Sequence, residues 1–125
     1  MKDWLKAEVL RLGNTMRWSW QGWCAAWSAE KSLRQWTGAQ AVSIALLLVL
    51  DVPLALAALI VALGFLVLAS ELFNTALEAV VNDIGTDIRP AAKLAKDCAS
   101  AGVALTALAA GSAWVFALAG IVAPG

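Results

Sequence analysis

The chain has 125 residues, of which 62% are hydrophobic and 14% are charged, and its formal net charge is zero. Soluble domains contain roughly 45–50% apolar and about 25% charged residues, so this composition indicates one small integral membrane domain over residues 1–125. A net charge of zero points to no acidic partner and argues against binding of nucleic acid. The chain contains no histidine, which excludes histidine-based metal sites and Ser-His triads.

Residues 1–35 combine tryptophan with lysine, arginine and glutamate. Apolar residues recur every three to four positions at Trp4, Val9 and Leu12, as they do in an amphipathic helix. Indole rings favour the membrane–water interface. Tryptophan is dense in and directly after this segment: Trp18, Trp20, Trp23, Trp27 and Trp36. These features predict an amphipathic helix that lies on the bilayer surface.

Three apolar segments follow, and we expect each to cross the membrane as a helix. The first, residues 36–50, is shorter than the roughly 20 residues that a span requires, unless its helix begins within the polar residues before it. The second, residues 54–82, is longer than a bilayer requires, so its end should reach the interface and beyond. The third covers residues 97–122. A break at residues 51–53 and the polar sequence NDIGTDIRPAAKLAKD separate the three spans.

The basic residues predict the orientation of these spans. All nine lysines and arginines fall within residues 2–34 and 89–96, and none lies in the 51–53 hairpin or at the C-terminus. Positively charged segments remain on the cytoplasmic side of a membrane. We therefore expect the N-terminal segment and the second loop to be cytoplasmic, and the hairpin and the C-terminus to lie outside.

Two carboxylates and an amide share one face of the second span. Steps of three and seven residues bring Glu71, Asn74 and Glu78 to the same side of a helix. An ionised carboxylate in apolar surroundings costs several kcal/mol unless it is paired. Protonation, a basic partner or a divalent cation would relieve this cost. Two interpretations remain open: a polar network that locks the helices together, and a site that binds a cation and an anion.

Further polar side chains are expected at the same cytoplasmic interface. Lys96 directly precedes the third span, Asp97 is the first residue of that span, and Glu30 lies near the start of the first. Carboxylates able to hold Mg²⁺ and a lysine able to bind phosphate favour phosphoryl transfer to a lipid, which depends chiefly on positioning and charge neutralisation. The sequence has none of the motifs of soluble kinases: GxxxxGK[ST], GxGxxG, HRD or DFG.

Two stretches resemble one known family. ELFNTALEAVVNDIGTDIRPAAKLAKDCASAGV is similar to the signature of the prokaryotic diacylglycerol kinase family, which is near E-x-x-N-[ST]-A-[IL]-E followed by A-K-D-x-x-[SA]-[AG]. WSWQGWCAAWSAEKSLRQ resembles the amphipathic N-terminal region of its Gram-negative form. The resemblance covers roughly residues 11–122. It implies a homotrimer of three-span subunits in the bacterial inner membrane, with a cytoplasmic N-terminus, a periplasmic C-terminus and active sites shared between subunits.

The resemblance also implies a reaction and assigns roles by matched position. The reaction is the MgATP-dependent phosphorylation of the primary hydroxyl of 1,2-diacylglycerol to phosphatidate. Glu71 would be the general base, and Glu30 and Glu78 would bind the Mg²⁺ that bridges the ATP phosphates. Asn74 would support that cluster, and Lys96 would neutralise the β- and γ-phosphates. The remaining nucleotide contacts would be Arg11, Trp18, Asp87, Ile88, Arg89 and Asp97. The lipid site would include, besides Glu71, the residues Ser19, Arg34, Gln35 and Ser100.

The chain departs from close relatives at four positions in its N-terminal region. Asn14 and Trp18 stand where lysine and tyrosine are more common, Trp36 stands where an acid is common, and Cys24 replaces a base. These departures concern nucleotide and headgroup binding rather than the reaction. Two other functions remain open: an undecaprenol kinase of the same fold, and a non-enzymatic membrane protein such as a transporter subunit or a scaffold. A transporter would place its ionisable residues near the bilayer midplane, whereas here they gather on one side.

Overall fold

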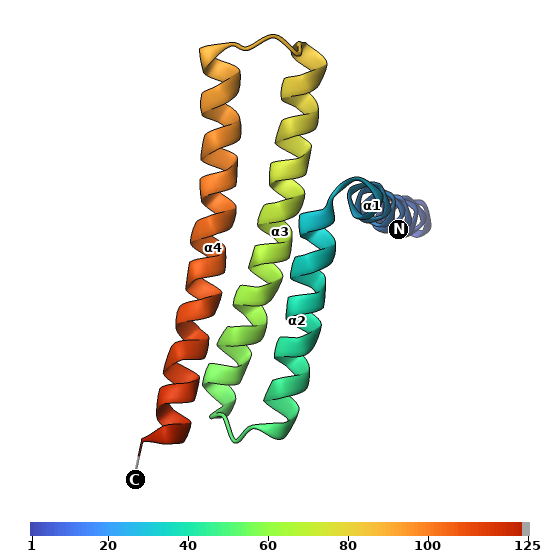
Figure 1. The fold of residues 1–125 in the computed structure, drawn as a ribbon. Helices are drawn as coiled ribbons and strands as arrows, with labels where there is room; N and C mark the ends of the chain where they lie inside the picture. The colour runs from blue at the N-terminus through green and yellow to red at the C-terminus, as the bar shows by residue number, and fades with distance from the viewer. Residues whose placement is uncertain (124–125) are drawn as a thin grey trace.

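The computed structural model describes residues 1–123, and these residues form four helices and no strand (Figure 1). Helix α1 spans Lys2–Ala29, α2 spans Lys31–Val49, α3 spans Leu54–Ile84 and α4 spans Pro90–Val122. Helices α2, α3 and α4 lie side by side with α3 in the middle, and α1 runs across the end of α2, away from the bundle (Figure 1). The expected all-α architecture is thus confirmed for the part of the chain that is described.

Two helices, α3 and α4, are long and apolar enough to cross a membrane. Helix α3 has 31 residues, which at about 1.5 Å per residue gives about 46 Å, against a hydrocarbon core of about 30 Å. Both helices extend well past the start of α2 at the end where they are connected to each other (Figure 1). Helix α2 has 19 residues, or about 28 Å, and it is more polar. Its role as a third span remains a prediction.

The break between α1 and α2 comes at Glu30, before the boundary near residue 35 that the sequence indicated. Glu30 has an extended backbone with φ −107° and ψ 117°. The reason lies in packing, because Leu33 is fully buried in a cluster with Ala26 and Leu68. A turn at Glu30 allows a side chain from α1 and one from α2 to contact α3 together. Helix α2 therefore begins among polar residues, as the short first span required.

Helices α3 and α4 extend further into the polar sequence between them than expected. Helix α3 continues to Ile84 and α4 already begins at Pro90, so the connection is only the segment 85–89. Pro90 suits the first turn of a helix, where no backbone N–H is needed. Some polar residues of this sequence, such as Asn82 and Lys96, are consequently held on helix ends, and the others lie in the connection.

The interior of the single chain is small. A second cluster at the hairpin end contains Ile60, Ala113 and Ala117, which α3 and α4 bury against each other. Large apolar side chains remain exposed on the outer faces, as at Phe65 and Leu108. A helix that is apolar all round requires lipid or further protein around it, so these faces are available to either.

Three polar contacts tie the three bundle helices together. Gln40 Nε2 in α2 donates a hydrogen bond to the carbonyl oxygen of Val61 in α3 at 3.1 Å. Trp114 Nε1 in α4 donates to Ser43 Oγ in α2 at 2.9 Å. The hydroxyls of Ser70 in α3 and Thr106 in α4 are 2.9 Å apart. Hydrogen bonds of this kind between membrane helices help to fix their relative positions.

We predict that Gly64→Ala destabilises the bundle. A Cβ built at Gly64 would lie 1.7 Å from Gln40 Oε1, and the buried Gln40 side chain could move only by giving up its bond to Val61. Overpacking of this type costs about 1–3 kcal/mol. The measurement is unfolding by heat or denaturant in detergent micelles, with Gly38→Ala as the control, because nothing lies within 4 Å of a Cβ at Gly38. Equal stability of the two variants would contradict this packing.

Candidate active site

The carboxylate of Glu71 is buried where α3 meets the start of α2. Glu71 is 5% exposed, and Ser32 Oγ donates a hydrogen bond to Glu71 Oε2 at 3.1 Å. A rise of about 1.5 Å per residue places Glu71 about 26 Å along α3 from Leu54. If the span begins at Leu54, Glu71 lies just inside the opposite edge of a hydrocarbon core about 30 Å thick, away from the 51–53 hairpin. A carboxylate at this depth can meet a molecule that enters from the bilayer.

Glu71 is not neutralised by a basic side chain of its own chain. In residues 1–123, the ion pairs join Glu8 to Arg11 and Lys93 to Asp97, and neither includes Glu71. The side chain next to Glu71 along the helix, Asn74, uses its Nδ2 for another carboxylate. Within the described residues, Glu71 is therefore not part of a structural ion pair.

A cavity of about 360 Å³ lies beside this carboxylate. Its walls come from three helices, and the lining residues are Ser32, Trp36, Glu71, Asn74, Ser100, Val103 and Ala104. Ser100 in α4 was expected in the lipid site, and the structure brings it to the same cavity as Glu71. The volume falls in the range of small-molecule sites.

Asn74 and Glu78 lie on the next turns of this face, toward the connection between α3 and α4. Asn74 Nδ2 donates a hydrogen bond to Glu78 Oε1 at 3.1 Å. Asn74 Oδ1 is the buried side-chain oxygen or nitrogen that lacks a hydrogen-bond partner in residues 1–123. A carboxylate and an unpartnered amide oxygen thus lie one helical turn apart.

These two oxygen atoms are suitable ligands for a Mg²⁺ ion that is also bound by substrate phosphates. Mg²⁺ usually takes one or two carboxylates together with phosphates and water, rather than a cage made only of protein. The described residues contain no group of three or more acidic, histidine or cysteine side chains that could hold a metal. Glu30, the other expected ligand, is half-buried at the α1–α2 break and joins no such group within the single chain.

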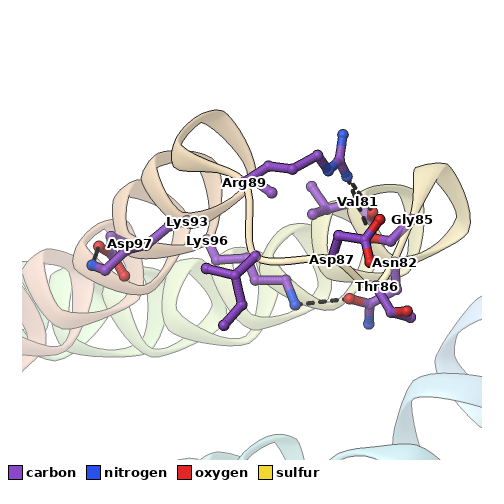
Figure 2. A pocket seen from close by; sticks show the side chains of 11 residues that line it. Val81, Asn82, Gly85, Thr86, Asp87, Arg89, Lys93, Lys96 and Asp97 are labelled. Atoms are coloured by element: carbon purple, nitrogen blue, oxygen red, sulfur yellow. Dashed lines mark hydrogen bonds and ion pairs between the residues drawn. The ribbon is translucent and has the colours of Figure 1, made fainter.

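A second cavity, of about 260 Å³, lies at the connection between α3 and α4 (Figure 2). Its lining includes five residues that were expected to contact the nucleotide: Asp87, Ile88, Arg89, Lys96 and Asp97. Lys93 lines it too and forms an ion pair with Asp97. The cavity thus gathers three basic and two acidic side chains, and Arg89 and Lys96 are the basic ones without an ion pair among the described residues.

Hydrogen bonds hold two of these basic side chains at the cavity (Figure 2). Lys96 Nζ in α4 donates to Asn82 Oδ1 in α3 at 2.7 Å. Arg89 Nη2 donates to the carbonyl oxygens of Val81 and Gly85 at 3.4 and 3.3 Å, so that it closes the end of α3. Cations favour the C-terminal end of a helix, where carbonyl groups lack partners.

The expected residues of α1 are not brought to these two cavities. Arg11 is paired with Glu8 at 2.7 Å between Nη2 and Oε2, and Trp18 is 64% exposed. Neither lines the Glu71 cavity or the α3–α4 cavity. Ser19 lines a separate cavity of about 540 Å³ between α1 and α3. Within residues 1–123, Arg11 and Trp18 thus lie on α1 outside both cavities.

Arg34 and Gln35 lie near the start of α2. The guanidinium of Arg34 donates to the carbonyl oxygens of Trp27 and Ser28, the latter at 3.5 Å. Arg34 therefore satisfies carbonyl groups at the end of α1 and fixes the break, a structural role in this chain. Gln35 is exposed and lines neither the Glu71 cavity nor the α3–α4 cavity.

The structure adds two polar residues that sequence patterns did not identify. Ser32 binds the carboxylate of Glu71, and Asn82 binds the amine of Lys96. Each pair joins side chains on different helices, and no periodicity along the chain relates residues so far apart. Such contacts require knowledge of how the helices pack.

Comparisons with known proteins agree with the motif. The sequence model of the family described as prokaryotic diacylglycerol kinase matches residues 17–118. The diacylglycerol kinase of Escherichia coli (strain K12) is 34% identical over 100 residues, which cover 80% of this chain and 82% of that protein. The diacylglycerol kinase of Pseudomonas aeruginosa is 37% identical, over 78% of this chain and 81% of that protein. The one from Synechocystis is 39% identical, over 77% of this chain and 55% of that protein. The resemblance in the motif is thereby confirmed, and the chain belongs to the prokaryotic diacylglycerol kinase family of ATP-dependent enzymes.

Proposed function

We propose that this protein transfers the γ-phosphate of ATP to the primary hydroxyl of 1,2-diacylglycerol, giving phosphatidate at the cytoplasmic face of the bacterial inner membrane. The observation that carries this proposal is the buried Glu71 carboxylate on a cavity at the edge of the apolar span. The cluster of basic side chains lies further along, at the connection of α3 and α4. A lipid hydroxyl and a nucleotide can thus approach from opposite directions.

In this proposal Glu71 is the general base. The hydroxyl oxygen of the lipid bonds to the γ-phosphorus, its proton passes to the Glu71 carboxylate, and the bond from the γ-phosphorus to the bridging oxygen of ADP breaks. Phosphoryl transfer depends mainly on alignment and charge neutralisation. A base on a rigid helix, with one oxygen already bound by Ser32, supplies alignment. The position of Glu71 near the apolar boundary allows the acyl chains to remain in the bilayer.

Glu78 and Asn74, with Glu30, would hold the Mg²⁺ that accompanies ATP. The unpartnered Asn74 Oδ1 next to Glu78 supports this assignment. When bound, the metal neutralises charge on the phosphates and orients them. Lys96 and Arg89 supply further positive charge at the α3–α4 cavity.

A homotrimer would give a role to the expected site residues that line neither cavity of the single chain. Helix α1 is directed away from its own bundle (Figure 1), and it carries the exposed Trp18 together with Arg11. In a trimer this helix can reach the site of a neighbouring copy. The exposed apolar faces of α3 and α4 would then contact other copies as well as lipid. A shared site would account for residues that match the family but lie outside the cavities of the single chain.

The alternative substrate is undecaprenol, which the same fold could accept. The assay presents purified protein in mixed micelles with ATP labelled on its γ-phosphate and with either lipid alcohol. The proposal requires label in phosphatidate at a higher kcat/KM than in undecaprenyl phosphate. The reverse order would establish the alternative, and label in neither lipid would favour a non-enzymatic protein.

The expected orientation can be tested by cysteine labelling. Asp51 is exposed at the 51–53 hairpin and Asp83 is exposed at the other end of α3. In a background where the exposed Cys24 and Cys98 are replaced by alanine, a membrane-impermeant thiol reagent should label Asp51→Cys from the periplasmic side only. Asp83→Cys should react only after the cytoplasmic side is opened. Labelling in the opposite pattern would overturn the orientation.

Glu71→Gln should abolish most of the activity while the protein stays folded. The amide keeps the shape of the side chain but cannot accept the hydroxyl proton, and loss of acid–base catalysis lowers turnover roughly 10²-fold or more. Stability should stay the same or rise, because a charge leaves an apolar site. The measurements are kcat and thermal unfolding, with Ser112→Ala as a control, since Ser112 is exposed and bonds only to its own helix. Full activity in the folded variant would make Glu71 part of a structural network.

Glu78→Gln should act differently from Glu71→Gln. Removal of the carboxylate weakens the proposed Mg²⁺ ligand set, so the affinity for MgATP should fall together with turnover. A higher Mg²⁺ concentration should restore part of the activity of Glu78→Gln and none of that of Glu71→Gln. MgATP affinity is measured by equilibrium binding to the purified protein. Normal affinity and turnover in Glu78→Gln at ordinary Mg²⁺ would refute the metal role.

A further inference from the structure

Ser32 lies in a position from which it can control the carboxylate of Glu71. It is the second residue of α2, is half-buried, and its Oγ donates to Glu71 Oε2 at 3.1 Å across 39 positions of the chain. Within residues 1–123, it is the side chain that donates a hydrogen bond to this carboxylate. The hydroxyl of Thr75 donates instead to the backbone carbonyl oxygen of Glu71, at 3.0 Å.

The two oxygens of Glu71 are in different environments as a result. Oε2 is bound by Ser32, whereas Oε1 accepts no hydrogen bond from the described residues and is not among their fully enclosed polar atoms. Glu71 lines the 360 Å³ cavity. One oxygen is therefore tethered, and the other is left for a molecule in that cavity.

We propose that Ser32 is a positioning residue for Glu71, which it orients so that Oε1 meets the lipid hydroxyl. This proposal rests on the role of Glu71 as the base in the proposed function. The terminal torsion of a glutamate is broad and is poorly fixed by its own rotamer preferences. A hydrogen bond to one oxygen fixes the plane of the carboxylate, and small misplacements of a reacting group lower rates strongly.

The position of Ser32 is itself fixed by the packing of its neighbour and by the start of α2. Leu33, the neighbour of Ser32, is fully buried against Ala26 and Leu68. The break at Glu30 and the bonds from Arg34 to the end of α1 set where α2 begins. Ser32 also lies in the first turn of α2, where unpaired backbone N–H groups create a field that favours a carboxylate. The fold of α1 onto α2 thus determines the orientation of a side chain on α3.

The first test compares Ser32→Ala with the control Ser112→Ala. A hydrogen bond to a charged group contributes enough that its loss should lower kcat roughly tenfold. The KM values for MgATP and for diacylglycerol should change less than about twofold, because Ser32 acts on the base and not on substrate binding. Ser32→Thr, which keeps the hydroxyl, should restore most of the lost kcat. Threonine and valine have nearly the same shape. The ratio of the kcat values of Ser32→Thr and Ser32→Val therefore measures the contribution of the hydroxyl to kcat, even if the alanine variant folds poorly.

The second test measures whether Ser32 acts through Glu71. In a Glu71→Ala background, Ser32→Ala should lower the residual kcat no further, since the tethered group is gone. A loss of equal size in both backgrounds would overturn the proposal and leave Ser32 a purely structural role. A Ser32→Val variant as active as Ser32→Thr would overturn it too. Failure of the wild-type protein to phosphorylate diacylglycerol would instead refute the proposed function, which separates the two claims.

Discussion

The structure depends on one constraint, the placement of a carboxylate on an apolar helix. Glu71 is buried, has no basic partner among the described residues, and lies on the part of α3 away from the 51–53 hairpin. A charge in lipid is tolerated only where a donor, water or a ligand can reach it. The start of α2 supplies the donor through Ser32, and the cavity formed with α4 supplies access. The break at Glu30 sets the start of α2, which carries Ser32, and the length of α3 allows Glu71 to lie far along it.

Much of this arrangement could be predicted from the sequence. Helices over the apolar segments follow from composition and length, and residues 71, 74 and 78 share one face because of helical periodicity alone. The expected loop residues, such as Arg89 and Lys96, do line one cavity, since the chain keeps them within two turns of each other. The family itself follows from a long motif that begins at Glu71. All of these features are local in the sequence.

The rest depends on contacts between distant residues. The end of α1 at Ala29 is set by the burial of Leu33 rather than by a local helix stop signal. Nothing in the sequence relates Ser32 to Glu71. Nor does it show that the side chain of Gln40 occupies the space beside Gly64. Local propensity is only a weak guide where tertiary packing decides the boundary.

We propose that Glu71 acts as the base at the edge of the apolar span and that the nucleotide binds at the connection of α3 and α4. Both sites would then lie toward the same end of the bundle. Paramagnetic broadening by Mn²⁺ in place of Mg²⁺, with ATP bound to protein whose backbone amides are isotopically labelled, measures this directly. We expect the amide signals near Asn74, Glu78 and Lys96 to broaden strongly and those of the 51–53 hairpin to stay unchanged. Broadening that is strongest at the hairpin, or that is absent from the end of α3 near Ile84, would contradict this arrangement.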